Sequence, residues 1–204
     1  MEPVKLTALP FELVARGPAG SRWAADGTTL EITSGALSDL FVDPVGEPAD
    51  SYPDVQRLVG EVDGPFQLSA RVSADFHDRF DAGVLLVHVD DTTWLKLCFE
   101  FSPAGRGTVV SVVTRGVSDD ANAWDVTGSS VFLRISRTGR AFALHSSDDG
   151  QVWQLVRVCS LGVPANRPVR VGFLSQSPTG AGCRAVFEDI EFSTRELGDT
   201  RDGS

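Results

Sequence analysis

The sequence predicts an all-β protein built as an antiparallel sandwich or barrel, with little or no helix. Three observations support this class. Nearly every apolar segment is short, alternates hydrophobic with polar residues, and is bounded by Gly, Pro, Asp or Ser. Turn residues separate these segments at intervals of about ten residues. The length of 204 residues favours two large packed sheets within one domain.

Ten segments meet the criteria for strands, and we expect that further strands exist. These segments are residues 30–33, 66–72, 82–89, 93–101, 108–115, 131–137, 141–146, 152–158, 169–175 and 184–192. Turn signals between several neighbouring segments predict tight hairpins, and the hairpins together predict one continuous meander. These signals are Asp90-Asp91, residues 102–107, Thr138-Gly139 and Asp149-Gly150.

Two segments do not fit a strand. Residues 43–54 are rich in Pro and acidic residues, so they predict a long surface loop, of the kind that can also border a binding site. Residues 195–204 contain little that can be buried, and we expect a disordered C-terminal tail. The folded domain is therefore predicted to span residues 1–194.

Charge and targeting signals exclude several partners. The formal net charge is -10, and no cluster of Lys and Arg occurs, so a nucleic-acid partner is not expected. The N-terminus lacks the features of a secretory signal, and no apolar run approaches the roughly 18 residues that span a bilayer. The three cysteines are widely spaced and predict reduced thiols. These features predict a cytoplasmic protein without membrane contact.

The strand at residues 93–101 has two dissimilar faces. Leu95, Leu97 and Phe99 point toward a core, whereas Trp94, Lys96 and Glu100 point the other way, because side chains alternate along a strand. A sugar ring can stack on an indole while its hydroxyls bond to charged groups. The alternative is a structural Lys-Glu pair, with Trp94 covering an edge of the sheet.

Neighbouring segments supply further candidate residues. Thr114, Ser118 and Asp119 lie at the end of a strand, where functional groups often gather. His88 shares the face of Trp94 if the turn at residues 90–92 has three residues, and faces the other way if it has two. The sequence leaves this register open, and the alternative is a partly buried, hydrogen-bonded histidine.

No catalytic residue is assigned. Glycosidases need two carboxylates about 5 Å or roughly 6.5 to 9.5 Å apart, and Glu100 has no acidic neighbour two residues away on either side. On the last strand, Glu188 and Asp189 face opposite sides. The motifs of a nucleophile elbow, a zinc site and nucleotide-binding loops do not occur, so we expect no cofactor and no metal. Scattered acidic loops leave calcium open.

Residues 146–153 fit the pattern S-x-D-x-G-x-x-W, which resembles the Asp-box hairpin of sialidases and other sugar-related β-proteins. In such a hairpin, Asp and Ser bond to the amides of the turn, Gly permits positive φ, and Trp153 packs over the turn. We expect a structural role for this hairpin.

Taken together, these motifs resemble the uncharacterised family called domain of unknown function 1349, whose members are similar to concanavalin A-like lectins and glucanases. The matching positions are Ala82 and Gly83; Trp94, Lys96 and Glu100; Thr114, Ser118 and Asp119; and Ser147, Asp149, Gly150 and Trp153. The resemblance implies a jelly-roll sandwich with ligands on its concave sheet. The chain departs from the family at Asp81, where Gln is usual, and after Asp119, where Trp124 is the candidate for a missing aromatic residue.

Three hypotheses follow. The first is a non-catalytic, lectin-like domain that binds a carbohydrate on the concave sheet through Trp94, Lys96 and Glu100. In that case Trp94→Ala should abolish sugar binding without unfolding the protein. The second is a protein-interaction or regulatory module, which should expose an apolar patch larger than a few hundred Å². The third is a glycan-active enzyme that uses Glu100 with Asp119. The ligand and the oligomeric state stay open.

Overall fold

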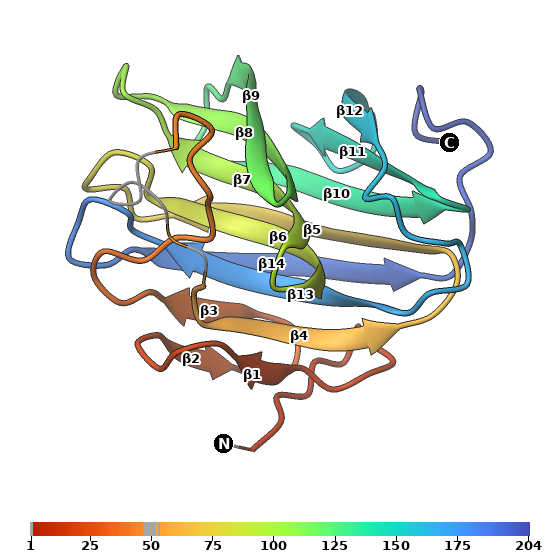
Figure 1. The fold of residues 1–204 in the computed structure, drawn as a ribbon, viewed down its shortest axis with the longest axis horizontal. Coiled ribbons are helices and arrows are strands. Elements are labelled where there is room, and N and C mark those ends of the chain that lie inside the picture. The colour runs from red at the N-terminus through yellow and green to blue at the C-terminus, as the bar shows by residue number, and fades with distance from the viewer. Residues whose placement is uncertain (1, 47–51, 53) are drawn as a thin grey trace.

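The computed structural model describes residues 2–46, 52 and 54–204, and these residues form fourteen strands in two seven-stranded antiparallel sheets (Figure 1). The first sheet has the order β1 (Val14–Arg16), β4 (Arg57–Val62), β13 (Val169–Gln176), β6 (Ala82–Asp90), β7 (Thr93–Phe101), β8 (Gly107–Arg115) and β9 (Val117–Asp125). The second has the order β12 (Gln154–Cys159), β11 (Ala141–Ser147), β10 (Ser130–Thr138), β5 (Phe66–Ala74), β14 (Arg184–Ser193), β3 (Leu30–Thr33) and β2 (Arg22–Ala25).

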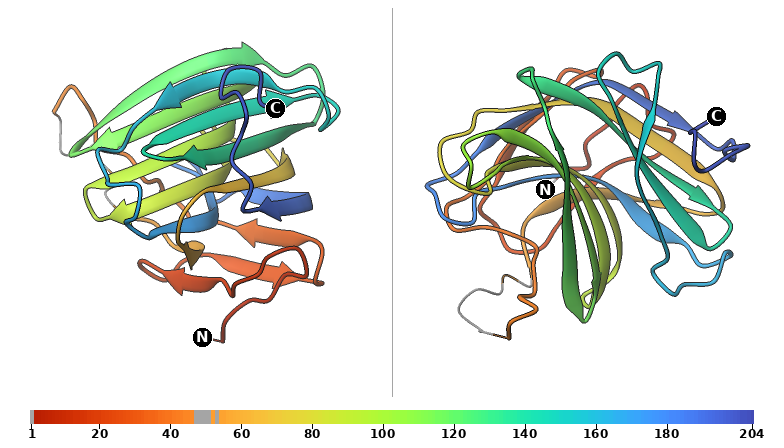
Figure 2. Two further views of the ribbon diagram at one scale, coloured as in Figure 1. Left: turned by 90° about the vertical axis from the view of Figure 1, so that its right-hand side faces the viewer. Right: turned by 90° about the horizontal axis from the view of Figure 1, so that it is seen from above.

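The two sheets stack face to face, as the side and top views show (Figure 2). The predicted antiparallel sandwich is confirmed, and the described residues contain no helix, so none that could cross a membrane. Each of the ten predicted strands is present within a few residues of its expected bounds.

The prediction of one continuous meander is wrong. Consecutive strands pair from β6 to β9 and from β10 to β12, but β5 pairs with β10 and β14, and β13 inserts between β4 and β6. Four strands were not predicted: β1, β2, β4 and β9. The strand β9 lies at the edge of its sheet and carries mostly polar side chains, so it has no hydrophobic alternation to mark it.

The main core lies between the sheets. Leu95, Leu97 and Phe99 of β7 are buried there, as the alternation of β7 predicts. Phe173 of β13 packs against Phe187 of β14, with ring centroids 5.0 Å apart. Full burial of such a side chain stabilises the fold by about 1.5–3 kcal/mol, so this interface holds the two sheets together.

A second hydrophobic cluster lies on the outer face of the first sheet. It contains Trp94, Leu86 and Leu174 from the strands, together with Leu40 from the connection between β3 and β4. We call residues 34–46 of this connection the strap. It crosses the outer face and shields a second buried layer from solvent.

The C-terminal residues differ from the expected disordered tail. The Arg134 guanidinium of β10 donates to the Gly203 carbonyl at 2.7 Å, and the His145 ring of β11 bonds to the Thr200 carbonyl at 3.1 Å. Leu197 is buried. The segment 197–204 therefore lies against the second sheet, because buried side chains of β10 and β11 provide partners for its backbone.

Candidate functional site

The residues Trp94, Lys96, Cys98 and Glu100 of β7 share the outer face of the first sheet, as alternation predicted. We call this surface the Lys96 face. The register pairs Trp94 with Thr114 of β8, so Thr114 lies on it as well. The sequence thus placed these groups on one side of the sheet, although it could not show what covers them.

His88 joins the Lys96 face through an irregularity that the sequence did not reveal. The turn between β6 and β7 has two residues, Asp91 and Thr92, which alone would point His88 the other way. A bulge between His88 and Asp90 adds Val89 to β6, and the register then pairs His88 with Trp94. The bulge therefore resolves the register in favour of a shared face.

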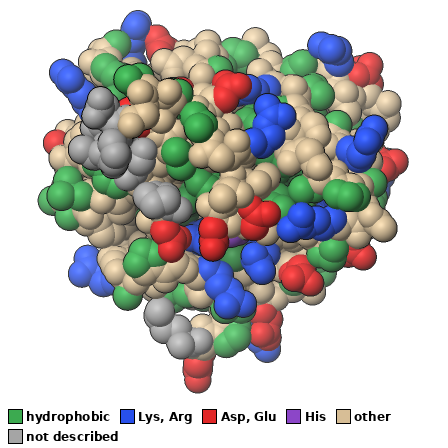
Figure 3. Space-filling model, viewed as in Figure 1, with side chains coloured by type: hydrophobic (Ala, Val, Ile, Leu, Met, Phe, Trp, Pro, Cys, Tyr) green, Lys and Arg blue, Asp and Glu red, His purple; other side chains and the backbone are tan. Residues whose placement is uncertain are grey.

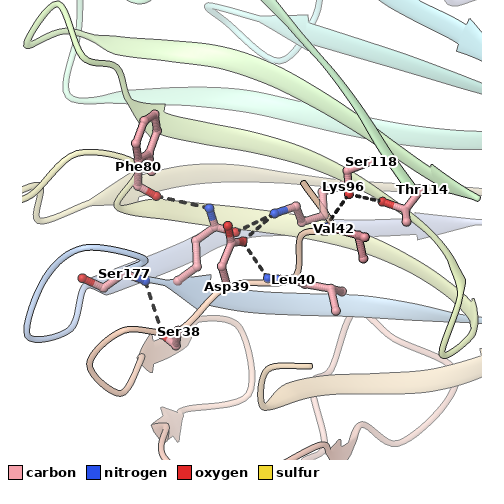
Figure 4. A network of polar contacts seen from close by, with 10 residues as sticks. Ser38, Asp39, Leu40, Val42, Phe80, Lys96, Thr114, Ser118 and Ser177 are labelled. Carbon is pink, nitrogen blue, oxygen red and sulfur yellow. Dashed lines mark hydrogen bonds and ion pairs between the residues drawn. The ribbon is translucent and has the colours of Figure 1, made fainter. Parts of the chain in front are cut away.

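Lys96 is buried and donates hydrogen bonds to two protein side chains (Figure 4). Its Nζ lies 2.7 Å from Oδ1 of Asp39 in the strap and 2.9 Å from Oε1 of Gln176 in β13. Burial alone would lower the pKa of Lys96, but the charge and hydrogen bond of Asp39 outweigh it and raise that pKa. Lys96 is thus a fixed cation that holds the strap.

Trp94 cannot serve as the expected stacking platform. Its side chain is 0% exposed, because the hydrophobic cluster that includes Leu40 covers it. Its indole Nε1 is buried without a hydrogen-bond partner. A sugar ring needs an open indole face, so this role is wrong for the structure described, and Trp94 is a packing residue.

Thr114 and Ser118 also hold the strap in place. Their hydroxyl oxygens lie 2.8 Å apart, and the Val42 amide donates to Ser118 Oγ at 2.9 Å. The Ser118 amide in turn donates to the Val42 carbonyl at 2.9 Å. Both residues are buried, so they anchor the strap to β8 and β9 and do not line an open site.

Asp119 and Trp124 lie away from the Lys96 face. Asp119 pairs in register with Val113, whose side chain faces the core, and its carboxylate lies 3.1 Å from Arg157 of β12. Trp124 packs against the main core. The expectation that they border one site with Glu100 is wrong. Alternation along β9 turns Asp119 to the opposite side, and an irregularity of β9 between Asn122 and Asp125 turns Trp124 there as well.

Glu100 keeps partial exposure at one end of the Lys96 face. Burial raises the pKa of its carboxyl to about 8; Lys96 opposes this shift, and the negative charges of Asp39 and Asp120 reinforce it. The carboxyl is therefore mostly protonated at neutral pH, so it can donate as well as accept a hydrogen bond.

Beside Trp94, His88 is buried and uncharged at neutral pH. Burial lowers its pKa to about 4, and the positive charges of Arg57 and Arg170 add to the effect. The alternative prediction for His88 is a partly buried, hydrogen-bonded histidine. The burial is confirmed, but Nδ1 has no hydrogen-bond partner.

Sequence reasoning missed Asp39, Gln176 and Asp120. Asp39 and Gln176 are far from Lys96 along the chain and meet it only through the fold. Asp120 follows Ser118 at a spacing of two, so alternation would have placed it on the Lys96 face had residues 117–125 been recognised as a strand.

The loop predicted at residues 43–54 continues the strap. Its described part includes a bridge between Tyr52 and Phe41, and residues 47–51 and 53 lie outside the described residues.

On the face of the molecule seen in Figure 3, acidic and basic side chains lie near one another, and hydrophobic side chains form small separate groups. No group of three or more His, Cys, Asp or Glu that could hold a metal occurs in the described part of the chain.

This geometry defines an all-β sandwich in which the chain's own strap covers one outer sheet face. Residues 18–195 match the family described as "Protein of unknown function (DUF1349)", and the chain belongs to that family.

A protein of Saccharomyces cerevisiae (strain ATCC 204508 / S288c) named "Regulation of enolase protein 1" is 27% identical over 130 residues. The match covers 63% of this chain and 64% of that protein, so the chain spans less than two thirds of this relative's length.

Solved structures that share the fold include the following two. A crystal structure of a functionally unknown protein from Saccharomyces cerevisiae superposes with a TM-score of 0.79 at 20% identity, covering 94% of this chain and 99% of that one. The "Xyloglucan PUL GH43B" protein of Bacteroides ovatus has a TM-score of 0.68 at 16% identity, covering 92% of this chain and 37% of that one.

Proposed function

We propose that this protein is a non-catalytic binding module that takes a neutral, hydroxyl-rich ligand of the carbohydrate class at the Glu100 end of the Lys96 face. The observation that carries the proposal is the state of Glu100. Its carboxyl is partly exposed and has a raised pKa of about 8. A protonated carboxyl can donate one hydrogen bond and accept another, which matches the donor and acceptor character of a hydroxyl.

The surroundings of Glu100 favour a neutral ligand. Asp120 and Asn122 lie on the same side of β9 and are exposed, so they offer two further hydrogen-bonding groups. The carboxylates near Glu100 would repel an anion, and Lys96 already neutralises Asp39. The pair predicted for catalysis, Glu100 with Asp119, is not formed, because Asp119 lies on the other side of β9.

The test is a titration of the purified protein with monosaccharides and short oligosaccharides, followed by calorimetry at pH 6.5 and pH 9. A bound sugar should lose affinity about tenfold or more in Glu100→Ala, whereas Glu100→Gln should keep most of it and lose its dependence on pH. Glu61→Ala is the matched control, since Glu61 is an exposed acid on β4 of the same sheet. A sugar that binds Glu100→Ala as well as the wild type would overturn this site.

A second candidate is a protein-interaction or regulatory module. The strap fills the part of the face above Trp94, which leaves no open indole for a sugar. The yeast relative's name also refers to regulation. Co-purification of one defined partner that is lost when exposed residues of the strap, such as Leu37 or Val45, are changed to Asp would support this candidate over the first.

A further inference from the structure

A pocket of about 380 Å³ lies on the outer face of the second sheet, far from Glu100 and independent of the proposed function. Strands β5, β10 and β14 form its floor and sides, and the hairpin between β11 and β12 adds one wall. Its polar lining residues are Gln67, Ser69, Arg134, Glu191 and Ser193, and its aromatic lining residues are Trp153 and Phe192. The sequence assigned the hairpin only a structural role.

Arg134 is a buried cation that has no carboxylate partner among the described residues. Its side chain is 7% exposed, and its guanidinium carbon lies 4.2 Å from the ring centroid of Trp153. One nitrogen, Nη2, donates to the Gly203 carbonyl, while Nε is buried without a partner. Burial lowers the pKa of Arg134 to about 10, so it stays charged at neutral pH. A buried charge without a counter-ion is costly to the fold.

The strand register places Arg134 in line with Glu191, with one strand between them. Ser69 of β5 pairs with Arg134 on one side and with Glu191 of β14 on the other. The backbones of Arg134 and Glu191 are thus two strand spacings apart, or about 10 Å, and the two charges form no ion pair. The pocket therefore has a cation at its buried wall, a hydroxyl between, and a carboxylate at its exposed wall.

We propose that this pocket binds the carboxylate group of a small organic ligand that carries a single negative charge. The carboxylate receives charge-assisted hydrogen bonds from Arg134, which are stronger than neutral ones. Ser69 and Gln67 offer further donors, and the ring of Trp153 contacts the apolar part of the ligand. Glu191 repels a second negative charge, so the pocket discriminates against dicarboxylates.

The test follows the indole N–H signal of Trp153 by NMR, assigned with Trp153→Phe, at pH 7 and constant ionic strength. The probes are butyrate, its neutral isostere butyramide, and the dianion succinate. Butyrate should give a saturable shift, butyramide none, and succinate a binding constant weaker by about fivefold or more. Arg134→Gln should weaken butyrate binding at least tenfold. Arg71→Gln, which removes a half-exposed arginine of the same sheet, is the matched control and should change nothing.

Two results would overturn the proposal: no saturable shift with butyrate, or equal binding of butyrate and butyramide. If Arg134→Gln does not fold, Glu191→Gln replaces it as the test variant. Glu191 is exposed, so its substitution should leave the fold intact. In that variant succinate should bind about as tightly as butyrate, and an unchanged preference would contradict the role of Glu191. Glu100→Ala should leave all of these results unaltered, which separates this site from the proposed function.

Discussion

Nζ of Lys96 lies 2.7 Å from Oδ1 of Asp39, and this buried ion pair joins the strap to the centre of the first sheet. The two residues are 57 positions apart in the chain. The strap also covers Trp94. The burial of the outer face therefore depends in part on this ion pair, which holds the strap on the sheet.

Removal of one member of this pair should destabilise the protein strongly. Asp39→Leu leaves Lys96 buried and charged without its counter-ion, and we expect a loss of about 3–5 kcal/mol in the free energy of unfolding. Urea denaturation measures this loss. The double variant Asp39→Leu/Lys96→Met should recover much of it. Lys5→Met, which breaks an exposed pair with Glu12, should cost less than about 1 kcal/mol.

Trp94→Ala should unfold the protein partly or wholly instead of acting only on a ligand. The side chain is completely buried, and such truncations cost about 3–5 kcal/mol. Trp94→Phe should cost less because it keeps most of the ring. Thermal denaturation followed by circular dichroism compares the two, and a Trp94→Ala protein as stable as the wild type would contradict the burial described here.

Glu100 should make stability decrease as pH rises. Its pKa is about 8 in the folded protein and about 4.3 when unfolded, so the folded state holds an extra proton between these values. The contribution of Glu100 to the free energy of unfolding is therefore fully present below about pH 4.3 and is lost as pH rises through about 8. His88 and His145 act in the opposite direction only below about pH 6.5. Urea denaturation between pH 6.5 and 9 should show a falling stability that Glu100→Gln flattens.

The hairpin of residues 146–153 should depend on Asp149, which makes the hydrogen bonds of the turn one position after Asp148, the Asp of the sequence pattern. Oδ1 of Asp149 accepts hydrogen bonds from the amides of Gln151 and Val152 and from the Ser147 hydroxyl. Asp149→Ala removes all three, and we expect a loss of about 1–2 kcal/mol, as for the loss of a helix cap. Chemical denaturation measures it, with Asp148→Ala, one position earlier, as the control. Equal effects of the two changes would show that the hairpin does not rely on these bonds.

Gly203 should be needed for docking of the C-terminal segment. It has a φ of 79°, and an added Cβ would lie 3.1 Å from the Cβ of Trp153 and would clash with the Arg134 guanidinium. Gly203→Ala should therefore release residues 197–204. Hydrogen exchange followed by mass spectrometry should show faster exchange in this segment and at its contacts on β10, whereas Gly64→Ala, at a glycine with open space around it, should leave exchange there unchanged.

The sequence predicted the sandwich, ten strands and the two faces of β7, because hydrophobic alternation records burial directly. It did not predict the fate of Trp94, since coverage by the strap depends on contacts such as Asp39 with Lys96 that no local pattern encodes. Asp119 and Trp124 were misplaced for a different reason. Asp119 lies on an edge strand of polar residues, where alternation is present but is not marked by hydrophobicity. Trp124 lies in an irregularity of that strand, which no local pattern encodes.

The extra residue at Val89 has a practical consequence for anyone who alters the β6–β7 hairpin. The two-residue turn alone would direct His88 to the core face, and the bulge at Val89 reverses this. His88 therefore pairs with Trp94 on the outer face only because the bulge accompanies the turn. If Val89 were kept but paired regularly, without the bulge, the two-residue turn would place His88 opposite Leu95 and direct it toward the core. A loop grafted at this site should therefore replace the bulge and the turn together, as four residues for residues 89–92.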